Sequence, residues 1–371
     1  MRDAMGIINL HDTSNGLLEL TNHRPVAAIP FLGRYRIIDF ALSNMVNSGI
    51  VNIGIFIQEK PRPLTEHLGT GAAWNLDRKK DGLFVFYPYY NSANSMYMTE
   101  MRSFRENIEY IKKSNQKYVI ISPSYMICNI NYSDALNYHR KTGADITIIY
   151  KKINDANVNF LNCQSLEINN EGRVIGFSTN MGEKSEKNIS MEMYIMKREF
   201  LLQLINKSSQ LSILYSLKDT INCFCKEINI NVFEHSGYLE CINSIKTYFH
   251  KSIELLDVEK TKQLFKKESP IYTVTKDNPP TKYGKNAIVK NSFIANGAVI
   301  EGVVKNSIIF RGVKIGTGAV VKNCIIMGKC VIAEGVYMEN TIADKHTVIS
   351  RVKKIIGYYD EPIVLEKNSI V

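Results

Sequence analysis

The C-terminal part of the chain places an aliphatic residue at every sixth position, and this spacing restricts the fold more than any other feature. The residues that follow it are Ile288, Ile294 and Ile300, then Ile309, Ile315 and Val321, then Ile326, Ile332 and Met338. A six-residue step within a coil of about three steps is typical of a parallel β-helix, in which each step turns one aliphatic side chain inward. The spacing therefore predicts a β-helix over residues 286–371.

A recurring tripeptide supports the same interpretation. It occurs at 290–292, 305–307, 322–324 and 339–341, and its asparagines are 15, 17 and 17 residues apart. Asparagine and glycine tolerate positive φ angles, so we expect these asparagines at the corners of the coils. A solenoid must also cover its terminal coil, and the segment 353–371, rich in Ile, Val and Tyr, is the predicted cover.

The N-terminal part has the alternating pattern of an α/β domain. Apolar runs at 4–10 and 51–58 predict buried strands, and helical spacing at 37–47 predicts the helix between them. Helices are also predicted at 101–111, 132–141, 198–208, 211–223 and 244–256, and strands at 118–122, 144–150, 165–168 and 174–178. We predict an α/β domain over 1–257 and a linker over 258–285, where paired prolines occur. In such a domain the ligand crevice lies beyond the carboxyl ends of the strands.

Composition limits the classes of partner and the compartment. The net charge of +10 suits anionic ligands such as nucleotides and sugar phosphates. The basic run 78–80 is closed by an acidic residue on each side, so it indicates a solvated face rather than nucleic-acid binding. We expect no membrane span and no signal peptide. Seven cysteines without framework spacing indicate a reduced, cytoplasmic location.

Two stretches carry a family resemblance. LTNHRP at 20–25 and RYRIIDFALSNMVNSGI at 34–50 resemble the N-terminal signature of the glucose-1-phosphate adenylyltransferases, or ADP-glucose pyrophosphorylases. These enzymes make ADP-glucose from ATP and glucose 1-phosphate for glycogen and starch. The resemblance implies a Rossmann-like nucleotidyltransferase (GT-A-like) domain followed by a left-handed parallel β-helix. In the family, the β-helix mediates assembly and helps to frame the effector site.

The phosphate-binding positions of the family are changed in this chain. The glycine run after the first strand corresponds to residues 11–16, and Gly16 stands where the family has an arginine. Side chains in this loop keep backbone N–H groups from approaching phosphates, and Asp12 adds a negative charge there. The lysine of the following motif is replaced by Val26.

The metal ligands and the sugar-phosphate motif differ as well. Aligned on 131–133, Ser124, Tyr125 and Met126 replace the family's Gly-Asp-His, and Cys241 replaces the aspartate of its Asp-Val-Gly-Thr. Asn180 replaces the lysine of Phe-Val-Glu-Lys-Pro, and residues 99–103 replace Gly-Thr-Ala-Asp-Ala. Because Mg²⁺ prefers hard oxygen ligands, we predict no catalytic residue, metal site or bound cofactor in this chain.

This pattern resembles the GlgD-type subunit of bacterial ADP-glucose pyrophosphorylase. The resemblance implies a regulatory subunit, inactive or poorly active alone, in a hetero-oligomer (a tetramer) with a catalytic GlgC-type paralogue that requires Mg²⁺. His23, Arg24 and Arg36 match positions that line the sugar-phosphate activator site of relatives. A structural alternative stays open at Arg36, which could cap a helix or pair with Asp39.

Two other functions are considered. A diverged sugar-phosphate nucleotidyltransferase would need new metal or phosphate ligands. A β-helix acyltransferase would need a catalytic histidine between coils, and His346 lies near the end of the repeats, which disfavours that function.

Overall fold

The structure, a computed structural model, describes residues 3–11, 16–87, 99–208 and 216–371. The chain forms two compact units. The first comprises Met1–Asp12, Phe40–Cys241 and Lys267–Tyr272, and the second comprises Thr13–Asp39, Ile242–Lys266 and Thr273–Val371. The second unit thus combines the β-helix with two segments that the sequence pattern assigned to the α/β domain. The predicted linker contains helix α10 (Val258–Leu264) and strand β14 (Lys282–Tyr283).

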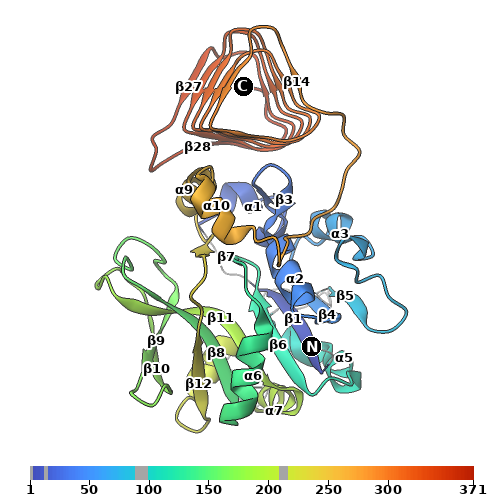
Figure 1. The fold of residues 1–371 in the computed structure, drawn as a ribbon, viewed down its shortest axis with the longest axis vertical. Coiled ribbons are helices and arrows are strands. Elements are labelled where there is room, and N and C mark those ends of the chain that lie inside the picture. Colours follow the sequence, from blue (N-terminus) through green and yellow to red (C-terminus); the bar gives the residue numbers. More distant parts are fainter. Residues whose placement is uncertain (1–2, 12–15, 88–98, 209–215) are drawn as a thin grey trace, which may run out of the picture. The chain divides into compact units, whose positions relative to one another are not determined.

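The first unit is built, within the described residues, on a nine-stranded mixed sheet (Figure 1). Its order is β10-β9-β11-β6-β1-β4-β5, and β8 pairs with both β11 and β12. Strand β1 runs parallel to β4 and β6, whereas β11 is antiparallel to β6 and β8. The strands are β1 (Ala4–Leu10), β4 (Asn52–Ile57), β5 (Gly82–Phe86), β6 (Tyr118–Pro123), β8 (Ile146–Ile153), β9 (Gln164–Ile168), β10 (Val174–Thr179), β11 (Lys187–Lys197) and β12 (Ile230–Glu234).

Helices of the first unit cover this sheet, and a short antiparallel pair, β7 (Met126–Cys128) and β13 (Leu239–Cys241), lies outside it. The helices are α2 (Ile37–Asn47), which begins in the second unit, α3 (Arg62–Leu68), α4 (Glu100–Glu106), α5 (Ile108–Lys113), α6 (Tyr132–Thr142), α7 (Arg198–Ser208) and α8 (Leu217–Cys223). The bounds of β1, α2 and α7 agree with the predicted ones.

Helix α2 holds the segment that follows β6 in place. The buried Asn44 side chain donates from Nδ2 to the carbonyl oxygen of Cys128 at 3.1 Å and accepts from the N–H of Ile130 at 3.1 Å. Ser48 Oγ accepts from the N–H of Tyr132 at 2.8 Å. These bonds satisfy buried backbone groups between β7 and α6, so the sequence of α2 fixes the position of β7.

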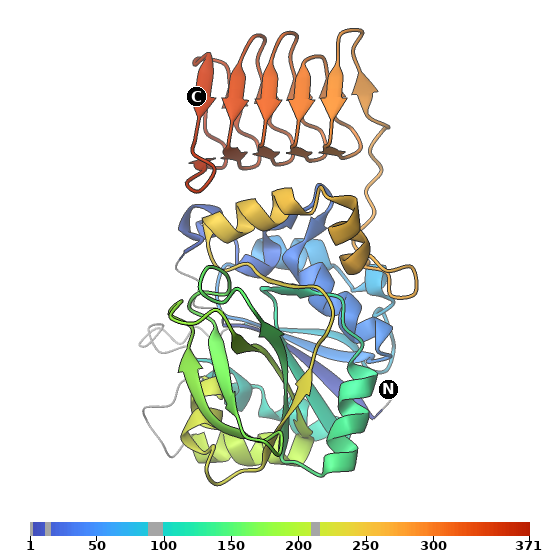
Figure 2. The same cartoon turned by 60° about the vertical axis from the view of Figure 1, so that its left-hand side comes forward.

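The second unit contains a left-handed β-helix whose triangular outline is visible in Figure 1. Its described strands form three parallel five-stranded sheets, stacked side by side in Figure 2. One sheet is β14, β17 (Val299–Ile300), β20 (Lys314–Ile315), β23 (Val331–Ile332) and β26 (Val348–Ile349). The second is β15 (Ile288–Lys290), β18 (Val303–Lys305), β21 (Val320–Lys322), β24 (Tyr337–Glu339) and β27 (Lys354–Ile356). The third is β16 (Phe293–Ile294), β19 (Ile308–Ile309), β22 (Ile325–Ile326), β25 (Thr341–Ala343) and β28 (Ile363–Leu365).

The remaining elements of the second unit are short. They are α1 (Leu18–Thr21), a 3₁₀ turn (Val26–Ala28), the strands β2 (Pro30–Phe31) and β3 (Tyr35–Arg36), and the helices α9 (Ile245–Glu254) and α10. Ser244 caps α9 in a capping box with Thr247. Among the described residues, no helix combines the length and the apolar character needed to cross a membrane.

The corner asparagines are confirmed. Asn291, Asn306, Asn323 and Asn340 have φ angles of 43°, 47°, 49° and 48°. Asn291 Nδ2 also donates to Asn306 Oδ1 at 2.9 Å, which ties successive coils together. The sequence pattern therefore located both the corners and most of the buried columns of the solenoid.

Several details of the prediction are wrong. Ile288 does not point inward: it is 47% exposed, and its neighbour Val289 occupies the inward column. The helix predicted at 101–111 is divided at Asn107 into α4 and α5. In the predicted helix 211–223, α8 begins at Leu217, and residues 211–215 lie outside the described residues. The predicted cover at 353–371 is correct only for its end: β27 and β28 belong to the coils themselves, and residues 369–371 bond to the last coil.

Candidate functional site

The two positions that align with metal carboxylates, Tyr125 and Cys241, lie close together in the first unit. Strand β7 pairs antiparallel with β13, and Cys241 lies directly opposite Met126. Met126 and Cys241 are buried, and Tyr125 immediately precedes β7. We call Tyr125, Met126, Cys163 and Cys241 the β7–β13 site. The alignment, which used sequence motifs alone, therefore brings together Tyr125 and Cys241, which are 116 residues apart in the sequence.

Sulfur and phenol groups take the place of carboxylates in this site. The Sγ atoms of Cys163 and Cys241 lie 3.4 Å apart, with Cys163 as the donor. This hydrogen bond and burial raise the pKa of Cys241 well above its ordinary value. The thiol is therefore neutral at physiological pH, and a neutral, soft donor is a poor ligand for Mg²⁺.

Asn180, which aligns with the sugar-phosphate lysine, is committed to the fold. Its side chain is fully buried, and Nδ2 donates to the carbonyl oxygens of Ala156 at 2.8 Å and Phe160 at 3.0 Å. The N–H of Gly182 donates to Asn180 Oδ1 at 3.2 Å. The amide thus closes a turn, and it brings no positive charge to a ligand.

The structure describes the first and last residues of the loop after β1, His11 and Gly16. His11 Nδ1 lies 2.7 Å from Asn9 Oδ1, and burial lowers the pKa of His11 to about 4. His11 is therefore uncharged near pH 7 and adds no cation for phosphates. In the second unit, the carbonyl oxygen of Gly16 accepts from the N–H of Ile245 at 2.8 Å, and a Cβ on Gly16 would lie 2.7 Å from a backbone oxygen. Asp12 lies outside the described residues.

Carboxylates of the first unit are engaged elsewhere. Glu100, the first residue of α4, accepts the N–H of Leu217 at 2.8 Å and so caps α8. Glu192 has a φ of 52° at a bulge of β11, and Lys218 Nζ lies 3.4 Å from it. Within the described residues, no three His, Cys, Asp or Glu side chains are grouped as metal ligands would be. The donor set of the β7–β13 site does not fit Mg²⁺, and we derive no metal-assisted step from it.

The second unit contains a crowded set of cations, which we call the cation cluster: Arg24, Arg36, Lys276, Arg311 and Lys345. Burial, followed by the charges of Arg36, Arg24 and Lys276, lowers the pKa of Lys345 to about 7. Burial and the charges of Arg36 and Arg311 also lower the pKa of Lys276. Repulsion of this kind is relieved by a bound anion, so perturbed lysines in a cluster indicate an anion site.

The three residues predicted from the sequence have different roles in this cluster. Arg24 is buried and forms an ion pair with Asp344, and its Nη1 lies 3.7 Å from Met327 Sδ. Arg36 is half-buried, and its backbone N–H donates to Asp39 Oδ2 at 3.0 Å. His23 is exposed, in contrast to Arg24 and Arg36. Arg24 and Arg36 both act on Lys345, so the structure brings these two together.

Sequence reasoning missed Lys276, Arg311 and Lys345. They lie in the predicted linker and at turns of the β-helix, outside the aliphatic and tripeptide repeats. Each is separated from Arg36 by more than 200 residues, so no local spacing relates them. The sequence signal for these residues was the net positive charge of the whole chain, and a net charge does not show where basic residues gather.

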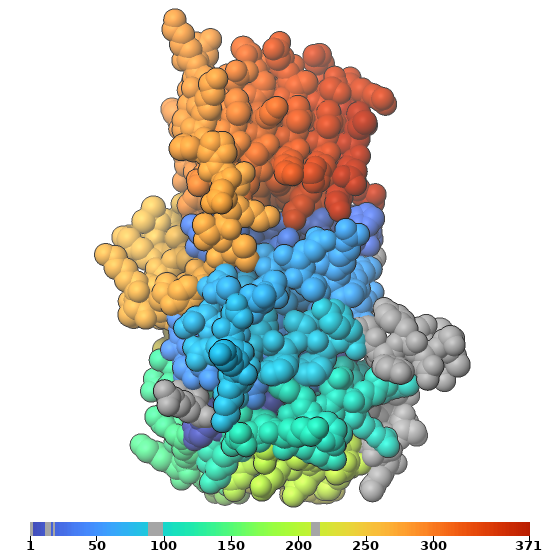
Figure 3. Space-filling model, turned by 90° about the vertical axis from the view of Figure 1, so that its right-hand side faces the viewer, coloured from blue at the N-terminus to red at the C-terminus, as the bar shows by residue number. Residues whose placement is uncertain are grey.

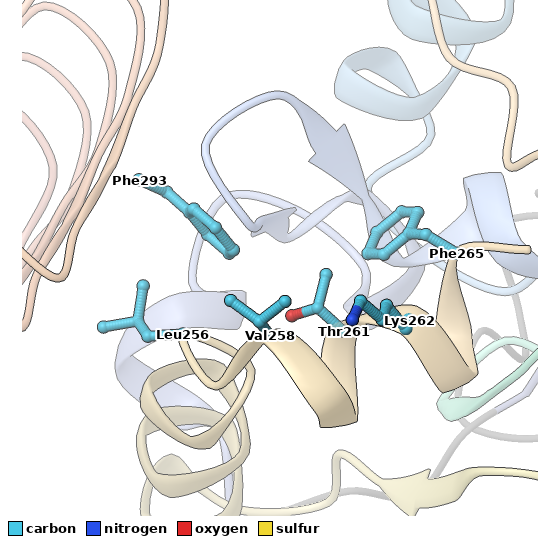
Figure 4. A pocket seen from close by; sticks show the side chains of 6 residues that line it. All are labelled: Leu256, Val258, Thr261, Lys262, Phe265 and Phe293. Atoms are coloured by element: carbon cyan, nitrogen blue, oxygen red, sulfur yellow. The ribbon is translucent and has the colours of Figure 1, made fainter.

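The same unit also contains an apolar cavity, which differs from the cation cluster in character. It encloses about 150 Å³ and is lined by Leu256, Val258, Thr261, Lys262, Phe265 and Phe293. Figure 4 shows Phe293, from the β-helix, opposite the side chains of α10 and Phe265. Without an acidic group or a cation pair in its lining, this pocket suits an apolar side chain rather than a phosphate.

Comparison with known proteins matches both parts of the chain. Residues 14–238 match the family model described as nucleotidyl transferase, and residues 279–361 match the model described as GlmU-like, C-terminal hexapeptide. A glycogen biosynthesis protein GlgD of Bacillus subtilis is 36% identical over 99% of this chain and 96% of its own length. GlgD of Geobacillus stearothermophilus is 39% identical over 85% of this chain and 82% of its own length.

Glucose-1-phosphate adenylyltransferases are also similar to this chain over most of its length. A glucose-1-phosphate adenylyltransferase of Geobacillus stearothermophilus is 33% identical over 82% of this chain and 80% of its own length. These matches extend across both units, and the family signature is thereby confirmed. The chain belongs to the nucleotidyl transferase family and, within it, to the glycogen biosynthesis protein GlgD group, which is related to ADP-glucose pyrophosphorylase.

Proposed function

We propose that this chain is a catalytically silent, regulatory subunit of a bacterial ADP-glucose pyrophosphorylase. It modulates the synthesis of ADP-glucose from ATP and glucose 1-phosphate by a catalytic paralogue in a cytoplasmic hetero-oligomer. The paralogue supplies the carboxylates that hold Mg²⁺, and this chain contributes interactions that alter its rate or its response to effectors.

The observation that carries the proposal is the β7–β13 site. A transferase fold is retained, yet the positions for metal carboxylates hold Tyr125 and Cys241, and Met126, which pairs with Cys241, aligns with the histidine. Metal ions lower the activation free energy of such a transfer by several kcal/mol, and each reduction of about 1.4 kcal/mol raises the rate tenfold. Asn180 and the neutral His11 add no cation that would compensate for this loss.

Two further observations support a regulatory role beside a paralogue. Geobacillus stearothermophilus has both a GlgD protein and a glucose-1-phosphate adenylyltransferase similar to this chain. The cation cluster of the second unit, in contrast to the β7–β13 site, is made of basic side chains. We propose that it binds a phosphorylated sugar, with Arg36 and Lys345 as contacts and Arg24 positioned behind them by Asp344.

The test is a pyrophosphorylase assay of the purified chain, of the catalytic paralogue from the same organism, and of their mixture. We expect no measurable ADP-glucose synthesis by the chain alone and a changed maximal rate or effector response in the mixture. The regulatory role is wrong if the full-length chain stays monomeric at micromolar concentration and leaves the kinetics of the paralogue unchanged.

One observation favours a diverged transferase as the second candidate. The charge of Glu192 acts on Cys241, so a carboxylate lies near the vacated position even though it does not align with a metal ligand. Mg²⁺-dependent turnover by the chain alone that is lost in Glu192→Gln would establish this alternative. Retention of that turnover in Glu192→Gln would exclude Glu192 as its basis.

A further inference from the structure

Two cysteines of the β7–β13 site are in contact, and the proposed function uses neither thiol. Cys163 Sγ donates to Cys241 Sγ at 3.4 Å, although the two residues are 78 positions apart in the chain. The sulfurs of a disulfide lie about 2.05 Å apart, so this contact is close to bonding distance. The buried Cys324 and Cys330 bond instead to backbone carbonyl oxygens, at 3.1 and 2.9 Å. Contact between sulfurs is therefore a property of the Cys163–Cys241 pair and does not follow from burial alone.

The turn before β9 holds Cys163 in place. Asn180 Nδ2 donates to the carbonyl oxygens of Ala156 and Phe160. The backbone N–H of Asn180 donates to the carbonyl oxygen of Cys163 at 2.8 Å. Phe160 and Asn162 have φ angles of 54° and 63°, which are unfavourable for residues that carry a Cβ. Such angles persist where the surroundings fix them, so the bonds of Asn180 set the position of Cys163.

The strand pair β7–β13 holds Cys241 on the other side of the contact. Cys241 is the last residue of β13 and pairs with Met126 of β7. Strand β7 is held in turn by Asn44 of α2, whose Nδ2 donates to the carbonyl oxygen of Cys128 at 3.1 Å. The two sulfurs therefore belong to two separately anchored segments, and a bond between them ties the turn before β9 to β13.

Both thiols are nearly buried, which restricts the reagents that can reach them. Cys163 and Cys241 are each 4% exposed, whereas Tyr125, Gln164 and Glu240, beside them along the chain or in the strand pair, are half-buried. On the face in Figure 3, the surface of the first unit is formed largely by segments that precede β7, coloured blue to teal, which contain neither cysteine. Narrow access of this kind suits a small oxidant such as hydrogen peroxide and excludes a bulky disulfide.

We propose that Cys163 and Cys241 form a reversible oxidation site, at which hydrogen peroxide joins their sulfurs in a disulfide and a thiol reductant separates them again. The hydrogen bond from Cys163 and burial raise the pKa of Cys241, so Cys241 keeps its proton and Cys163 reacts first. The residue numbers thus assign an attacking thiol and a resolving thiol.

The reaction balances with one peroxide molecule. The sulfur of Cys163 attacks one peroxide oxygen, the O–O bond breaks, and the other oxygen leaves as water with the thiol proton of Cys163, so that a sulfenic acid remains. The sulfur of Cys241 then attacks the oxidised sulfur, the S–O bond breaks, and the hydroxyl group leaves as water with the proton of Cys241. The two thiols lose two electrons, and the peroxide is reduced to two water molecules.

The disulfide closes a loop that contains β9 to β12. Because its ends are 78 positions apart, the bond restricts the unfolded chain and thereby favours the folded first unit. It forms within one chain and needs neither a paralogue nor an effector. The inference therefore goes beyond the proposed function and does not rest on it.

The experiment treats the full-length chain with hydrogen peroxide and maps its disulfides. The parent protein carries Cys223→Ser and Cys225→Ser, because these cysteines are exposed and half-buried and would react with the oxidant on their own. Trypsin releases Cys163 in the peptide 153–173 and Cys241 in the peptide 227–246, and neither peptide has another cysteine. We expect the two peptides to be linked, two thiols per chain to be lost, and the urea midpoint to rise, and we expect dithiothreitol to reverse all three changes.

Two variants of the parent separate the pair from the other buried cysteines. Cys163→Ser should lose both the link and the rise of the urea midpoint. The matched control is Cys324→Ala, which removes a buried cysteine of the β-helix and should keep both. If Cys163→Ser does not fold, the linked peptides of the parent still decide, because they require no variant of the pair.

Three results overturn the oxidation site. They are an unchanged number of thiols in the folded parent, oxidation of Cys163 to a sulfinic acid without a link, and a link from either peptide to another cysteine. None of these results affects the proposed function, which the assay with the paralogue decides separately.

Discussion

The β7–β13 site and the cation cluster differ in how their polar groups are satisfied. In the β7–β13 site the side chains satisfy one another: Cys163 donates to Cys241, and nearby Asn180 bonds to the backbone. In the cation cluster the side chains repel one another, and the pKa of Lys345 falls to about 7. The first arrangement needs no ligand to be stable, whereas the second is relieved by an anion.

Under the proposed function, this difference corresponds to a catalytic site that has been lost and a binding site that has been kept within one chain. A site released from catalysis can fill with neutral side chains that improve packing, because nothing opposes such changes. A cluster of partly buried like charges is costly to the fold, and its persistence in the second unit favours a ligand there. The following experiments test this contrast, beginning with the largest expected effect.

The first experiment attempts to restore catalysis in the β7–β13 site. We expect Tyr125→Asp combined with Cys241→Asp to stay at least about a thousandfold below the paralogue in ADP-glucose synthesis, since the phosphates still lack cations at Gly16, Val26 and Asn180. Release of pyrophosphate measures the rate, and circular dichroism verifies the fold. Cys241→Ser serves as the control for loss of the thiol alone. A double variant that makes ADP-glucose at a rate within tenfold of the paralogue would show that the site lacks only its metal ligands. It would refute the statement that the phosphate-binding cations are also lost.

The second experiment breaks the ion pair that supports the cation cluster. The side chains of Arg24 and Asp344 are 4% and 1% exposed. Asp344→Ala leaves a buried guanidinium unpaired, and we expect a loss of about 3–5 kcal/mol in the free energy of unfolding. Arg24→Met with Asp344→Leu should recover most of that loss. Urea unfolding measures both, and Glu66→Ala, at the exposed Arg62–Glu66 pair, should show no resolvable change.

The third experiment concerns Arg36 as an anion contact. Charge-assisted hydrogen bonds contribute about 1.5–3 kcal/mol each, so we expect Arg36→Ala to weaken binding of a hexose bisphosphate about tenfold or more. Calorimetry on the full-length chain measures the affinity. Arg351→Ala, at an exposed position of the same unit, is the matched control. Equal affinity in wild type and Arg36→Ala would remove Arg36 from the site.

The fourth experiment uses the lowered pKa of Lys345. A bound anion favours the charged amine, so binding takes up a proton above pH 7, and the affinity should fall as pH rises, by up to about tenfold per pH unit. Sulfate is the probe because its own charge is constant from pH 6 to 9. In the absence of an anion the sign for stability is opposite. The native pKa lies below the ordinary 10.5, so stability rises with pH between about 7 and 10.5.

Lys345→Met supplies the control for this pH dependence. It should bind sulfate more weakly at pH 6 and with little change up to pH 9. A wild-type affinity that does not vary with pH would show that Lys345 does not contact the anion.

Much of the fold follows from short periodicities in the sequence. The six-residue aliphatic step predicted the solenoid because each inward position needs the same kind of side chain. It placed Ile288 on the wrong side because its neighbour Val289 is equally aliphatic, and a shift of one residue in a strand exchanges the two faces. The break at Asn107 was missed because the apolar spacing continues through it.

The candidate sites were predicted unevenly. Alignment with the family motifs placed Tyr125 and Cys241 close together, because Met126, the residue after Tyr125, pairs with Cys241 across β7 and β13. The cation cluster could not be assembled in the same way. Lys276, Arg311 and Lys345 meet because chain segments far apart in sequence fold against one another, and single lysines at turns look like ordinary surface residues.

The last experiment compares the backbones of the two units at one asparagine in each. Asn306 has a φ of 47° at a β-helix corner, where Ala is strained and Gly is not, so we expect Asn306→Ala to be less stable than Asn306→Gly by about 0.5–1 kcal/mol. Both variants lose the bond from Asn291, so their difference isolates the backbone. Asn137 is exposed within α6, where Gly costs about 1 kcal/mol relative to Ala, and the order of the two variants should reverse. Urea unfolding measures all four variants. The same order at both positions would mean that the corner asparagines are retained for their side-chain ladder and not for their φ angles.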